Sequence, residues 1–407
     1  MINKNDDNLM EKIVSLCKRR GFVFPGSEIY GGFAGFYDYG HLGLALQNNI
    51  KNSWWKKFVD NRRDMYGINS AIILNPKVWE ATGHVANFAD PLDGKAFNTM
   101  LTTNVGAGEE STLSYLRPET AQGIFVNFKN TVDAYHPKLP FGMAQIGKAF
   151  RNEIAPRDFT FRQREFEQME IEYFVRAEDW EKYFTYWQDE VNEWIEEIGL
   201  DMSKMHELEV EEADRAHYSK RTIDFEFDFP FGRKELFGLA YRSDFDLKTH
   251  KIEYVDEDAG GKIIPHVIEP SFGLDRAFLA LLISAYTEDN SKDEMRPYLK
   301  FKPSIAPIIC AVSPLLKNKP ELVEYANVKV FAMLKAEFGR VAWDDNGNIG
   351  KRYRRQDEIG TPFCIVIDFE TLEGDTKDTV TIRDRDTGEQ ERVKVSELVG
   401  YIKSKLE

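Results

Sequence analysis

The spacing of apolar residues predicts secondary structure along most of the chain. Alternation of apolar and acidic positions over residues 223–229 predicts a half-buried strand. Residues 178–198 are predicted to form a long helix, because an aromatic stripe recurs there at helical spacing: Trp180, Phe184, Trp187, Val191 and Trp194. A stripe of this kind is typical of core packing, so the middle of the chain is predicted to hold strands with inserted helices.

Two further helices are predicted near the N-terminus. The first is amphipathic, covers Leu9 to Lys18 and ends near Gly21, and the second covers Leu44 to Val59. The segment between them, GFVFPGSEIYGGFAGFYDYGHLG, is rich in glycine and aromatic residues. Its glycines predict tight turns, because glycine adopts backbone conformations that other residues avoid.

The pattern changes near residue 300 to an alternation of strands and helices. We expect strands over residues 305–312, 341–344 and 363–368, helices over 322–338 and 351–359, a hairpin that turns at 386–388, and a last helix after Ser396. This alternation predicts a separate α/β domain of about a hundred residues. The predicted division is a first domain over residues 1–300, with a helical insertion at about 176–215, and a second domain over 301–407.

Composition narrows the classes of function. The chain has 407 residues and a formal net charge of −15, which argues against indiscriminate coating of nucleic acid, because such binding depends on neutralised phosphates. The N-terminus lacks the order of a secretion signal and the longest apolar run, Ala277 to Ala285, is too short to span a bilayer, so we expect a cytoplasmic protein without membrane contact. Cys17, Cys310 and Cys364 are scattered, which favours neither a disulfide framework nor a zinc site.

One stretch combines many charges of both signs. FRNEIAPRDFTFRQREFEQMEIEYF, residues 150–174, holds four arginines and six carboxylates interleaved with apolar residues. A solvated surface is the ordinary interpretation of such a run. Here the alternation instead predicts two strands, joined by a turn at residues 155–158, that share one buried face and one face lined with charges. Charges held on a sheet indicate a binding site.

A second stretch, HVIEPSFGLDRAFLALL, covers residues 266–282. It predicts a strand with Glu269 and Ser271 that turns at Gly273 into a helix whose first turn carries Arg276. Arginines in both stretches can bind phosphates through paired hydrogen bonds, and Phe166 offers a ring on which a base can stack. The two stretches together predict a site for a nucleotide and an amino acid.

Several segments of the chain resemble one enzyme family. Residues 150–174 and 267–282 look like motifs 2 and 3 of the class II aminoacyl-tRNA synthetases, and residues 21–55 resemble the region of motif 1. YLRPETAQGIFVNFKN, FGMAQIGKAFRNEIAPR, REFEQMEIEYF and EPSFGLDR are together similar to the homodimeric glycyl-tRNA synthetases, and GKRYRRQDEIGTPF resembles their anticodon-binding domain. The resemblance implies an α+β fold, with an antiparallel class II sheet flanked by helices and a C-terminal α/β anticodon-binding domain.

The resemblance also implies which residues bind ATP. Arg151 and Arg276 would be catalytic, with Arg151 bridging the α-phosphate and the glycine carboxylate. Arg162 would hold the distal phosphates, and Phe166 and Arg276 would sandwich the adenine. The full implied ATP site is Arg151, Asn152, Glu153, Phe161, Arg162, Phe166, Glu235, Leu236, Gly273, Leu274, Asp275 and Arg276.

The implied glycine site surrounds a molecule that carries both charges. Glu119, Glu170 and Ser271 would hold its ammonium and fill the space in which a side chain would project. Steric exclusion of larger amino acids by packed atoms matters, because the gain or loss of one methylene contact separates two substrates by only about 1–3 kcal/mol. The full implied site is Glu119, Arg151, Phe166, Glu167, Gln168, Met169, Glu170, Glu269, Pro270 and Ser271. Glu235 and Glu269 are the carboxylates implied to bind the Mg²⁺ that accompanies ATP.

An activity and its partners follow from the same resemblance. The chain would activate glycine with ATP to glycyl-adenylate and transfer glycine to the 3′-terminal adenosine of tRNA(Gly), as a homodimer. Lys351, Arg352, Arg354 and Arg355 would contact the anticodon, although a basic run is usually a solvated helix face. For any single site residue, the alternative is an arginine that pairs with a core carboxylate or a glutamate that caps a strand end.

The sequence departs from the family at two places. The segment DPLDGKAFNTMLTTNVGAGEESTLSYLRPETAQ is short and has no cysteine where bacterial relatives carry a zinc-binding insertion, so no zinc is expected. His41 stands where the family commonly has proline, and both His41 and His84 are expected to be structural. Two rival functions stay open: a synthetase for another small amino acid, and a non-catalytic relative that binds RNA or a polymerase partner. The intact residues of the implied ATP site argue against the second rival.

Overall fold

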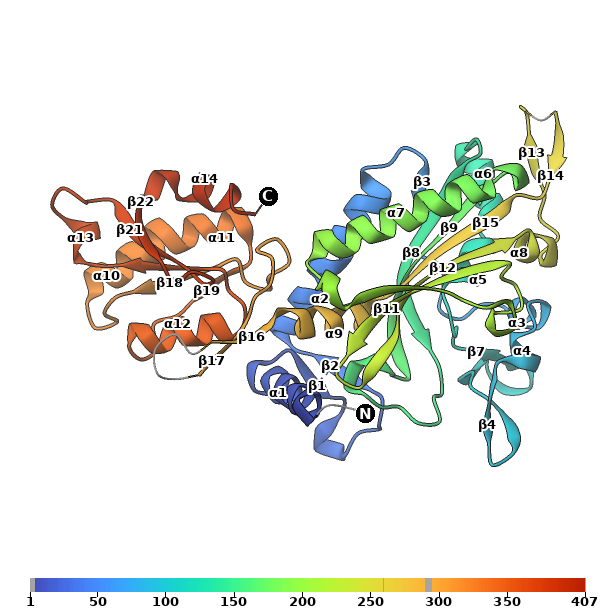
Figure 1. Ribbon diagram of the computed structural model, residues 1–407, viewed down its shortest axis with the longest axis horizontal. Helices are drawn as coiled ribbons and strands as arrows, with labels where there is room; N and C mark the ends of the chain where they lie inside the picture. Colours follow the sequence, from blue (N-terminus) through green and yellow to red (C-terminus); the bar gives the residue numbers. More distant parts are fainter. Residues whose placement is uncertain (1–3, 259, 290–294, 407) are drawn as a thin grey trace.

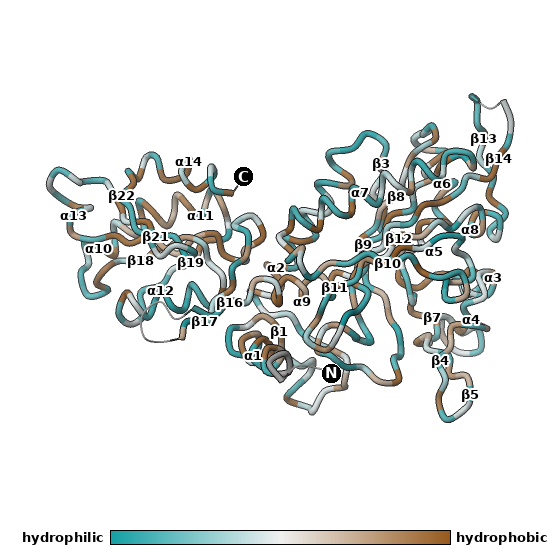
Figure 2. Tube along the Cα trace, in the orientation of Figure 1, coloured by the Kyte–Doolittle hydropathy of each residue, from teal (hydrophilic) through white to brown (hydrophobic). Residues whose placement is uncertain are grey.

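The computed structural model describes residues 4–258, 260–289 and 295–406 of the chain. Figure 1 shows a large part, built around long neighbouring strands, and a smaller part that the red C-terminal elements form beside it. Apolar residues lie mainly along the inner strands and helices of both parts (Figure 2). No helix within these described ranges is long and apolar enough to cross a membrane.

A seven-stranded sheet organises the large part, in the order β10-β11-β12-β15-β9-β8-β3. All neighbouring pairs are antiparallel except β3 and β8, which run parallel. The strands are β3 (Met65–Gly67), β8 (Phe141–Phe150), β9 (Glu165–Val175), β10 (Met205–Glu209), β11 (Arg221–Phe229), β12 (Gly232–Ser243) and β15 (His266–Gly273). This largely antiparallel sheet with its flanking helices confirms the predicted α+β class.

Three helices cover one face of this sheet: α2 (His41–Trp55), α7 (Trp180–Ile198) and α9 (Leu274–Ala285). They pack large aromatic residues against the strands, and Trp54, Trp187 and Phe272 are all 0% exposed. The predicted alternation in β11 is confirmed, because Phe225 and Phe227 lie in the same core. Since successive side chains of a strand point to opposite faces, the intervening polar residues line the other face of the sheet.

Shorter elements connect and flank the sheet. The N-terminal ones are α1 (Lys4–Arg20), β1 (Val23–Pro25) and β2 (Tyr37–Tyr39), and α2 continues into a π-helical turn (Lys56–Asp60). Between β3 and β8 lie α3 (Pro76–Ala81), α4 (His84–Asn87), β4 (Ala89–Leu92), β5 (Lys95–Asn98), β6 (Thr102–Val105), β7 (Thr112–Tyr115), α5 (Ala121–Phe125) and α6 (Phe128–Tyr135). After β12 come α8 (Phe245–Thr249), β13 (Tyr254–Asp256) and β14 (Gly261–Ile263), and after α9 come β16 (Tyr286–Asp289) and β17 (Arg296–Leu299).

Two predicted segments differ from the structure. The connection between β8 and β9 covers residues 151–164 instead of a short turn at 155–158, so Arg151 and Arg162 lie in a loop. The segment expected as a helical insertion at about 176–215 contains α7 and also β10, which is an edge strand of the main sheet. Both elements are therefore integral to the large part.

The smaller part has a five-stranded sheet in the order β19-β18-β20-β21-β22. β18 (Cys310–Pro314) runs parallel to β19 (Val341–Trp343) and β20 (Phe363–Ile367), while β21 (Thr379–Asp384) and β22 (Gln390–Lys394) form the predicted hairpin. Its helices are α10 (Pro320–Tyr325), α11 (Ala332–Phe338), α12 (Ile349–Glu358), α13 (Phe369–Leu372) and α14 (Leu398–Lys403), with a π-helical segment between α10 and α11. The predicted α/β alternation is confirmed.

The first strand of the smaller part begins later than predicted. Ile305, Ala306 and Ile308 pack in the core of the large part, whereas Ile309 belongs to the second core. This packing favours a boundary near residue 308 over one at residue 300. The two parts also contact each other through Glu358 on α12, which forms ion pairs with two arginines at the end of α1.

Candidate active site

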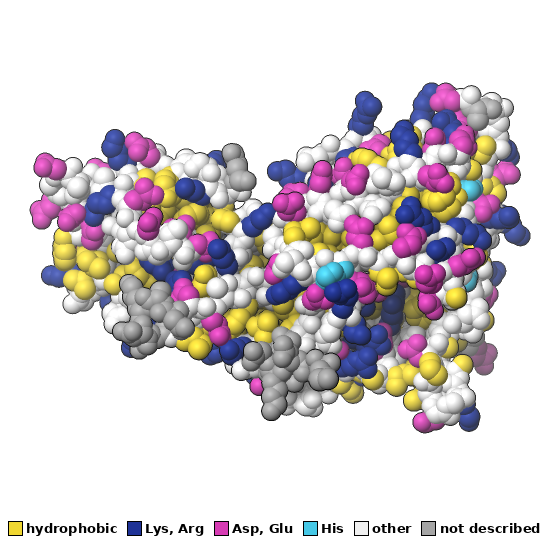
Figure 3. Space-filling model, viewed as in Figure 1, with side chains coloured by type: hydrophobic (Ala, Val, Ile, Leu, Met, Phe, Trp, Pro, Cys, Tyr) yellow, Lys and Arg dark blue, Asp and Glu magenta, His cyan; other side chains and the backbone are white. Residues whose placement is uncertain are grey.

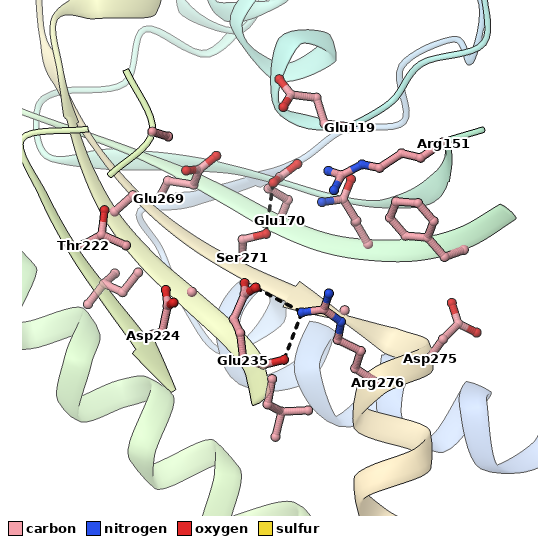
Figure 4. Close-up of a pocket in the computed structure, with 18 of the residues that line it drawn as sticks. Glu119, Arg151, Glu170, Thr222, Asp224, Glu235, Glu269, Ser271, Asp275 and Arg276 are labelled. Atoms are coloured by element: carbon pink, nitrogen blue, oxygen red, sulfur yellow. Dashed lines mark hydrogen bonds and ion pairs between the residues drawn. The ribbon is translucent and has the colours of Figure 1, made fainter. Parts of the chain in front are cut away.

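A cavity of about 500 Å³ lies over the polar face of the main sheet. Strands β9, β11, β12 and β15 contribute to its lining, together with the loop after β8, the start of α9 and the segment from Val210 to Tyr218. Figure 3 shows lysine and arginine side chains beside a hollow in the large part, and Figure 4 shows residues that line the cavity. A cavity of this size with converging polar groups is typical of a small-molecule site.

Most of the predicted ATP and glycine residues line this cavity, although they come from segments far apart in the sequence. Those that line it are Glu119, Arg151, Glu153, Phe161, Arg162, Phe166, Glu167, Gln168, Glu170, Glu235, Leu236, Glu269, Ser271, Gly273, Asp275 and Arg276. Asn152, Met169, Pro270 and Leu274 are predicted residues outside this lining. Met169 and Leu274 lie in the apolar core instead, and for Met169 the reason is the alternation of side chains along β9.

Arg151 and Arg162 lie in the loop after β8. Nε of Arg151 donates a 3.0 Å hydrogen bond to the carbonyl oxygen of Pro118, and its guanidinium lies 5.2 Å from the centre of the Phe166 ring. Nη1 of Arg162 lies 3.5 Å from a carboxylate oxygen of Glu153. These contacts use only some of the five N–H donors of each arginine, so both can bind phosphate or carboxylate groups as well.

Arg276 lies in the first turn of α9, as predicted. Its Nη1 donates to the backbone carbonyl oxygen of Glu235 at 2.9 Å and lies 3.1 Å from Oε2 of the same residue (Figure 4). The guanidinium lies 4.5 Å from the centre of the Phe161 ring. Phe161 is therefore the ring beside Arg276, and an adenine sandwich between Phe166 and Arg276 stays a prediction.

Asp275, which was predicted to bind ATP, is 5% exposed and joins three elements of the fold. Its Oδ2 accepts a 2.8 Å hydrogen bond from the backbone N–H of Glu167. Its Oδ1 accepts one from the Tyr39 hydroxyl and one of 3.3 Å from Nε2 of Gln47. Burial raises the pKa of Asp275 to about 6. Both carboxylate oxygens thus serve donors of the protein itself and fix the start of α9 against β9.

The residues predicted to hold the glycine ammonium come from three segments and meet in the cavity (Figure 4). Strand register places Ser271 beside Glu170, whose Oε1 accepts a 3.1 Å hydrogen bond from the Ser271 hydroxyl and whose Oε2 accepts one from the Thr120 hydroxyl. Burial raises the pKa of Glu170, and the charge of Glu119 adds to this. Burial also acts to raise the pKa of Glu119, but neighbouring groups, foremost His84 and then Arg242 and Arg151, lower it to about 2. Carboxylates in this arrangement suit a positively charged ligand group.

Arg242, which was not predicted from the sequence, is a buried cation beside these residues. It is 1% exposed, its Nε and Nη2 donate to the two oxygens of Asp246 at 2.7 and 2.8 Å, and its Nη1 donates to Oε1 of Glu269 at 2.7 Å. Its guanidinium lies 3.7 Å from the centre of the Tyr218 ring. Burial raises the pKa of Glu269 to about 8, although Arg242 acts to lower it. The only sequence signal was the four-residue spacing between Arg242 and Asp246.

The two carboxylates predicted to bind Mg²⁺ have different surroundings. Glu269 pairs with the buried Arg242, whereas Glu235 pairs with Arg276 at 3.1 Å and also lies beside Asp224, whose pKa is raised to about 7 by burial and by the Glu235 charge (Figure 4). Binding of Mg²⁺ by Glu235 and Glu269 stays a prediction, and Asp224 is a further carboxylate beside Glu235. In the part of the chain that the structure describes, no group of three or more His, Cys, Asp or Glu side chains is placed to hold a metal ion.

The four cations predicted to contact the anticodon lie on α12 and differ in exposure. Arg352 is 2% exposed, and its guanidinium donates to three backbone carbonyl groups at 2.5 to 3.2 Å. It therefore holds neighbouring loops, which contradicts the prediction that it contacts RNA. Arg355 pairs with Asp344 at 2.6 Å, while Lys351 and Arg354 are exposed.

Comparison with known proteins identifies two families along the chain. Residues 107–286 match the tRNA synthetase class II core domain (G, H, P, S and T), and residues 309–405 match the anticodon binding domain. The chain is 42% identical to the glycine–tRNA ligase of Thermus thermophilus, over 98% of this chain and 99% of the relative. The glycine–tRNA ligases of Bacillus cereus and Deinococcus radiodurans are 43% and 42% identical, with the same shares of each chain.

These matches agree with the architecture and with the site. The class II family covers the strands β8, β9, β12 and β15, which carry much of the cavity, and the second family covers the smaller sheet. The alignments with the three relatives run over 462 to 500 positions, so the relatives have segments that this chain of 407 residues lacks. The predicted resemblance is confirmed, and the chain belongs to the glycine–tRNA ligases among the class II aminoacyl-tRNA synthetases.

Proposed function

We propose that the chain activates glycine with ATP to glycyl-adenylate and then transfers glycine to the 3′-terminal adenosine of tRNA(Gly). The observation that carries this proposal is the combination of charges in one cavity, where Arg151, Arg162 and Arg276 meet the carboxylates Glu119 and Glu170. ATP and the glycine carboxylate are anions, whereas the glycine ammonium is a cation. The cavity thus offers a partner for each charge that the reaction brings together.

In the first step, an oxygen of the glycine carboxylate attacks the α-phosphorus of ATP, and pyrophosphate leaves. No general base is needed, because this carboxylate is already ionised near neutral pH. We assign Arg151 to the α-phosphate and the glycine carboxylate, Arg162 to the distal phosphates, and Arg276 to the adenine. Mg²⁺ held by Asp224 and Glu235 would supply charge neutralisation on the phosphates.

In the second step, a hydroxyl group of the terminal adenosine attacks the glycyl carbonyl carbon, and AMP leaves.

We assign anticodon contact to the smaller part, through Lys351, Arg354 and Arg355, and we leave Arg352 out because it is buried. We further propose that the anticodon-binding domain begins near residue 308, where the core of the large part ends.

A homodimer is proposed from an exposed apolar surface. Ile29, Tyr30 and Phe33, in the loop between β1 and β2, are 89%, 88% and 80% exposed. Large apolar side chains gathered at a surface are typical of an interaction site. Sedimentation of the purified chain tests this proposal, and a fully active monomer would reject it. Separately, we propose that the protein resides in the cytoplasm, and cell fractionation tests this.

We also propose that the chain holds no structural zinc. The support is that the sequence has no cysteine between residues 18 and 309, a range that includes the shortened segment. Elemental analysis of the purified protein tests this, and about one tightly bound zinc ion per chain would reject it.

Pyrophosphate exchange measured with each of the common amino acids tests the first step. We expect exchange with glycine alone. Exchange with another small amino acid would favour a synthetase of different specificity, and no exchange with any amino acid would favour a non-catalytic RNA-binding relative. Charging of tRNA(Gly) with labelled glycine tests the second step.

A further inference from the structure

His84, expected from the sequence to be structural, lies directly against Glu119. It is the first residue of α4, and its Nε2 lies 3.4 Å from Oε1 of Glu119. Both side chains are buried, with 9% and 10% of their surface exposed. Oε1 of Glu119 accepts no hydrogen bond within the standard distance and angle from the residues that the structure describes, and Nε2 of His84 is the polar group that lies against it.

The ring of His84 is held from its other side as well. Nδ1 lies 2.7 Å from the hydroxyl oxygen of Thr82, which in turn is 3.0 Å from the carbonyl oxygen of Val78 on α3. The ring also packs edge to face with Trp79, with ring centres 5.3 Å apart. These contacts fix the direction in which Nε2 points. An unprotonated Nε2 would set a lone pair against a carboxylate oxygen of Glu119, so we assign a proton to Nε2.

We propose that His84 is a positioning residue for glycine, which holds Glu119 through Nε2 so that this carboxylate receives the glycine ammonium. The inference rests on the proposed function and deepens it. A buried carboxylate without a partner would turn away or take up a proton, and either change would remove the charge that the ammonium needs. Contact with His84 engages one oxygen of Glu119 and leaves acceptor sites on the other oxygen for the substrate.

The two arginines near Glu119 are engaged elsewhere. Arg242 donates to Asp246 and Glu269, and Nε of Arg151 donates to a backbone carbonyl group. They act on Glu119 through their charge, whereas His84 is the foremost of the groups that hold the pKa of Glu119 at about 2. Removal of His84 should therefore weaken binding of the ammonium more than any other part of the reaction.

The effect should fall on the KM for glycine. Glu119 would contact the ammonium in the bound substrate and in the transition state alike, and a contact of this kind lowers KM with little effect on kcat. The KM for ATP should stay unchanged, because the ammonium is not part of ATP. A purely structural role for His84 would not separate these constants in this way.

Two amide variants separate the two contacts of the ring. His84→Gln places an amide N–H near the position of Nε2, whereas His84→Asn extends only as far as Nδ1 and so keeps the contact with Thr82 alone. In pyrophosphate exchange, we expect His84→Asn to raise the KM for glycine about tenfold and His84→Gln to raise it less than about threefold. The control is His206→Asn, which removes a histidine–carboxylate pair of 2.7 Å with Asp228 at the edge strand β10 and should leave this KM unchanged.

Equal KM values for glycine in His84→Asn and His84→Gln would overturn the proposal. So would a lower melting temperature in His84→Asn with an unchanged KM for glycine, because His84 would then only stabilise the fold. Failure of the proposed function appears in a different measurement, since the unmodified chain would then show no glycine-dependent exchange, and the role of His84 would fall with it.

Discussion

Arg242→Met tests whether one buried cation holds the glycine end of the cavity together. Methionine fills much of the volume of arginine but removes its charge and all of its donors. Asp246, which is 0% exposed, and Glu269, which is 6% exposed, would each lose an ion-pair partner. Glu172 belongs to the same cluster and is also fully buried, and within the described ranges its carboxylate makes no hydrogen bond.

The magnitude follows from the burial of these carboxylates. Loss of one partner of a buried ion pair costs about 3–5 kcal/mol, because the remaining charge is left without compensation. At about 2–4 °C per kcal/mol, the melting temperature should fall by roughly 6–20 °C. The unpaired carboxylates of the native variant bind protons more readily than those of the unmodified chain. The difference in the free energy of unfolding between the unmodified chain and Arg242→Met should therefore grow as the pH rises from about 6 to 8.

Tryptophan fluorescence can follow the melting of the large part, since Trp343 is the only one of the seven tryptophans in the smaller part. Arg233→Met is the matched control, because Arg233 lies on the same strand and pairs with Asp228 at 2.9 Å in an exposed position. Glycine-dependent pyrophosphate exchange should fall sharply in Arg242→Met and stay normal in the control. A melting temperature equal to that of the control at pH 8 would refute the view that Arg242 compensates the buried carboxylates.

Three further predictions concern the cavity and α12. Arg276→Ala should lower the rate of glycine-dependent exchange about a hundredfold, equivalent to about 3 kcal/mol, without lowering the melting temperature, and near-normal exchange would remove Arg276 from the site. Ser271→Gly should weaken glycine binding by about 1 kcal/mol and admit alanine, whereas Glu119→Gln should impair glycine activation without admitting alanine. Exchange assays with glycine and alanine on both variants distinguish the effect of pocket size from the effect of the carboxylate charge. Lys351→Glu combined with Arg354→Glu should raise the KM for tRNA and leave exchange unchanged, and unaltered charging kinetics would show that α12 does not contact RNA.

Periodicity predicted the elements that depend on one-sided packing. The stripe from Trp180 to Trp194 and the alternation in β11 were recognised because each element buries one face against the same core. Boundaries were less accurate where tertiary packing decides them. Ile305 and Ile308 read as part of the first strand of the smaller part, yet they pack in the core of the large part, and nothing in the local pattern shows which core an apolar residue joins.

The candidate site was predicted best where its residues are close together in the sequence. Arg276 follows a strand that ends at Gly273, and that local geometry was readable. Arg242 was missed, because its role depends on Glu269, which lies 27 residues away and which only the folded chain brings near it. The contact of His84 with Glu119, 35 residues away, was not predicted for the same reason. Arg352 shows the opposite error, because a basic helical run does not reveal which of its cations is turned inward. Pairing and burial are properties of the fold, and a single sequence does not specify them residue by residue.

Residues 93–116, the part of the shortened segment that precedes RPETAQ, give a reason why the cavity can form without the longer segments of the relatives. Among the described residues that line the cavity, none comes from residues 93–116, although His84 lies before this stretch and Glu119 just after it. The segment instead anchors its neighbours: Nδ2 of Asn98 donates to the carbonyl oxygen of Val85 at 2.9 Å, and the carbonyl oxygen of Thr99 accepts a 2.7 Å hydrogen bond from the loop after β8. Two short hairpins thus suffice to bring His84 and Glu119 together. Any effect of the missing residues should therefore appear in the tRNA-dependent step and leave glycine activation unchanged.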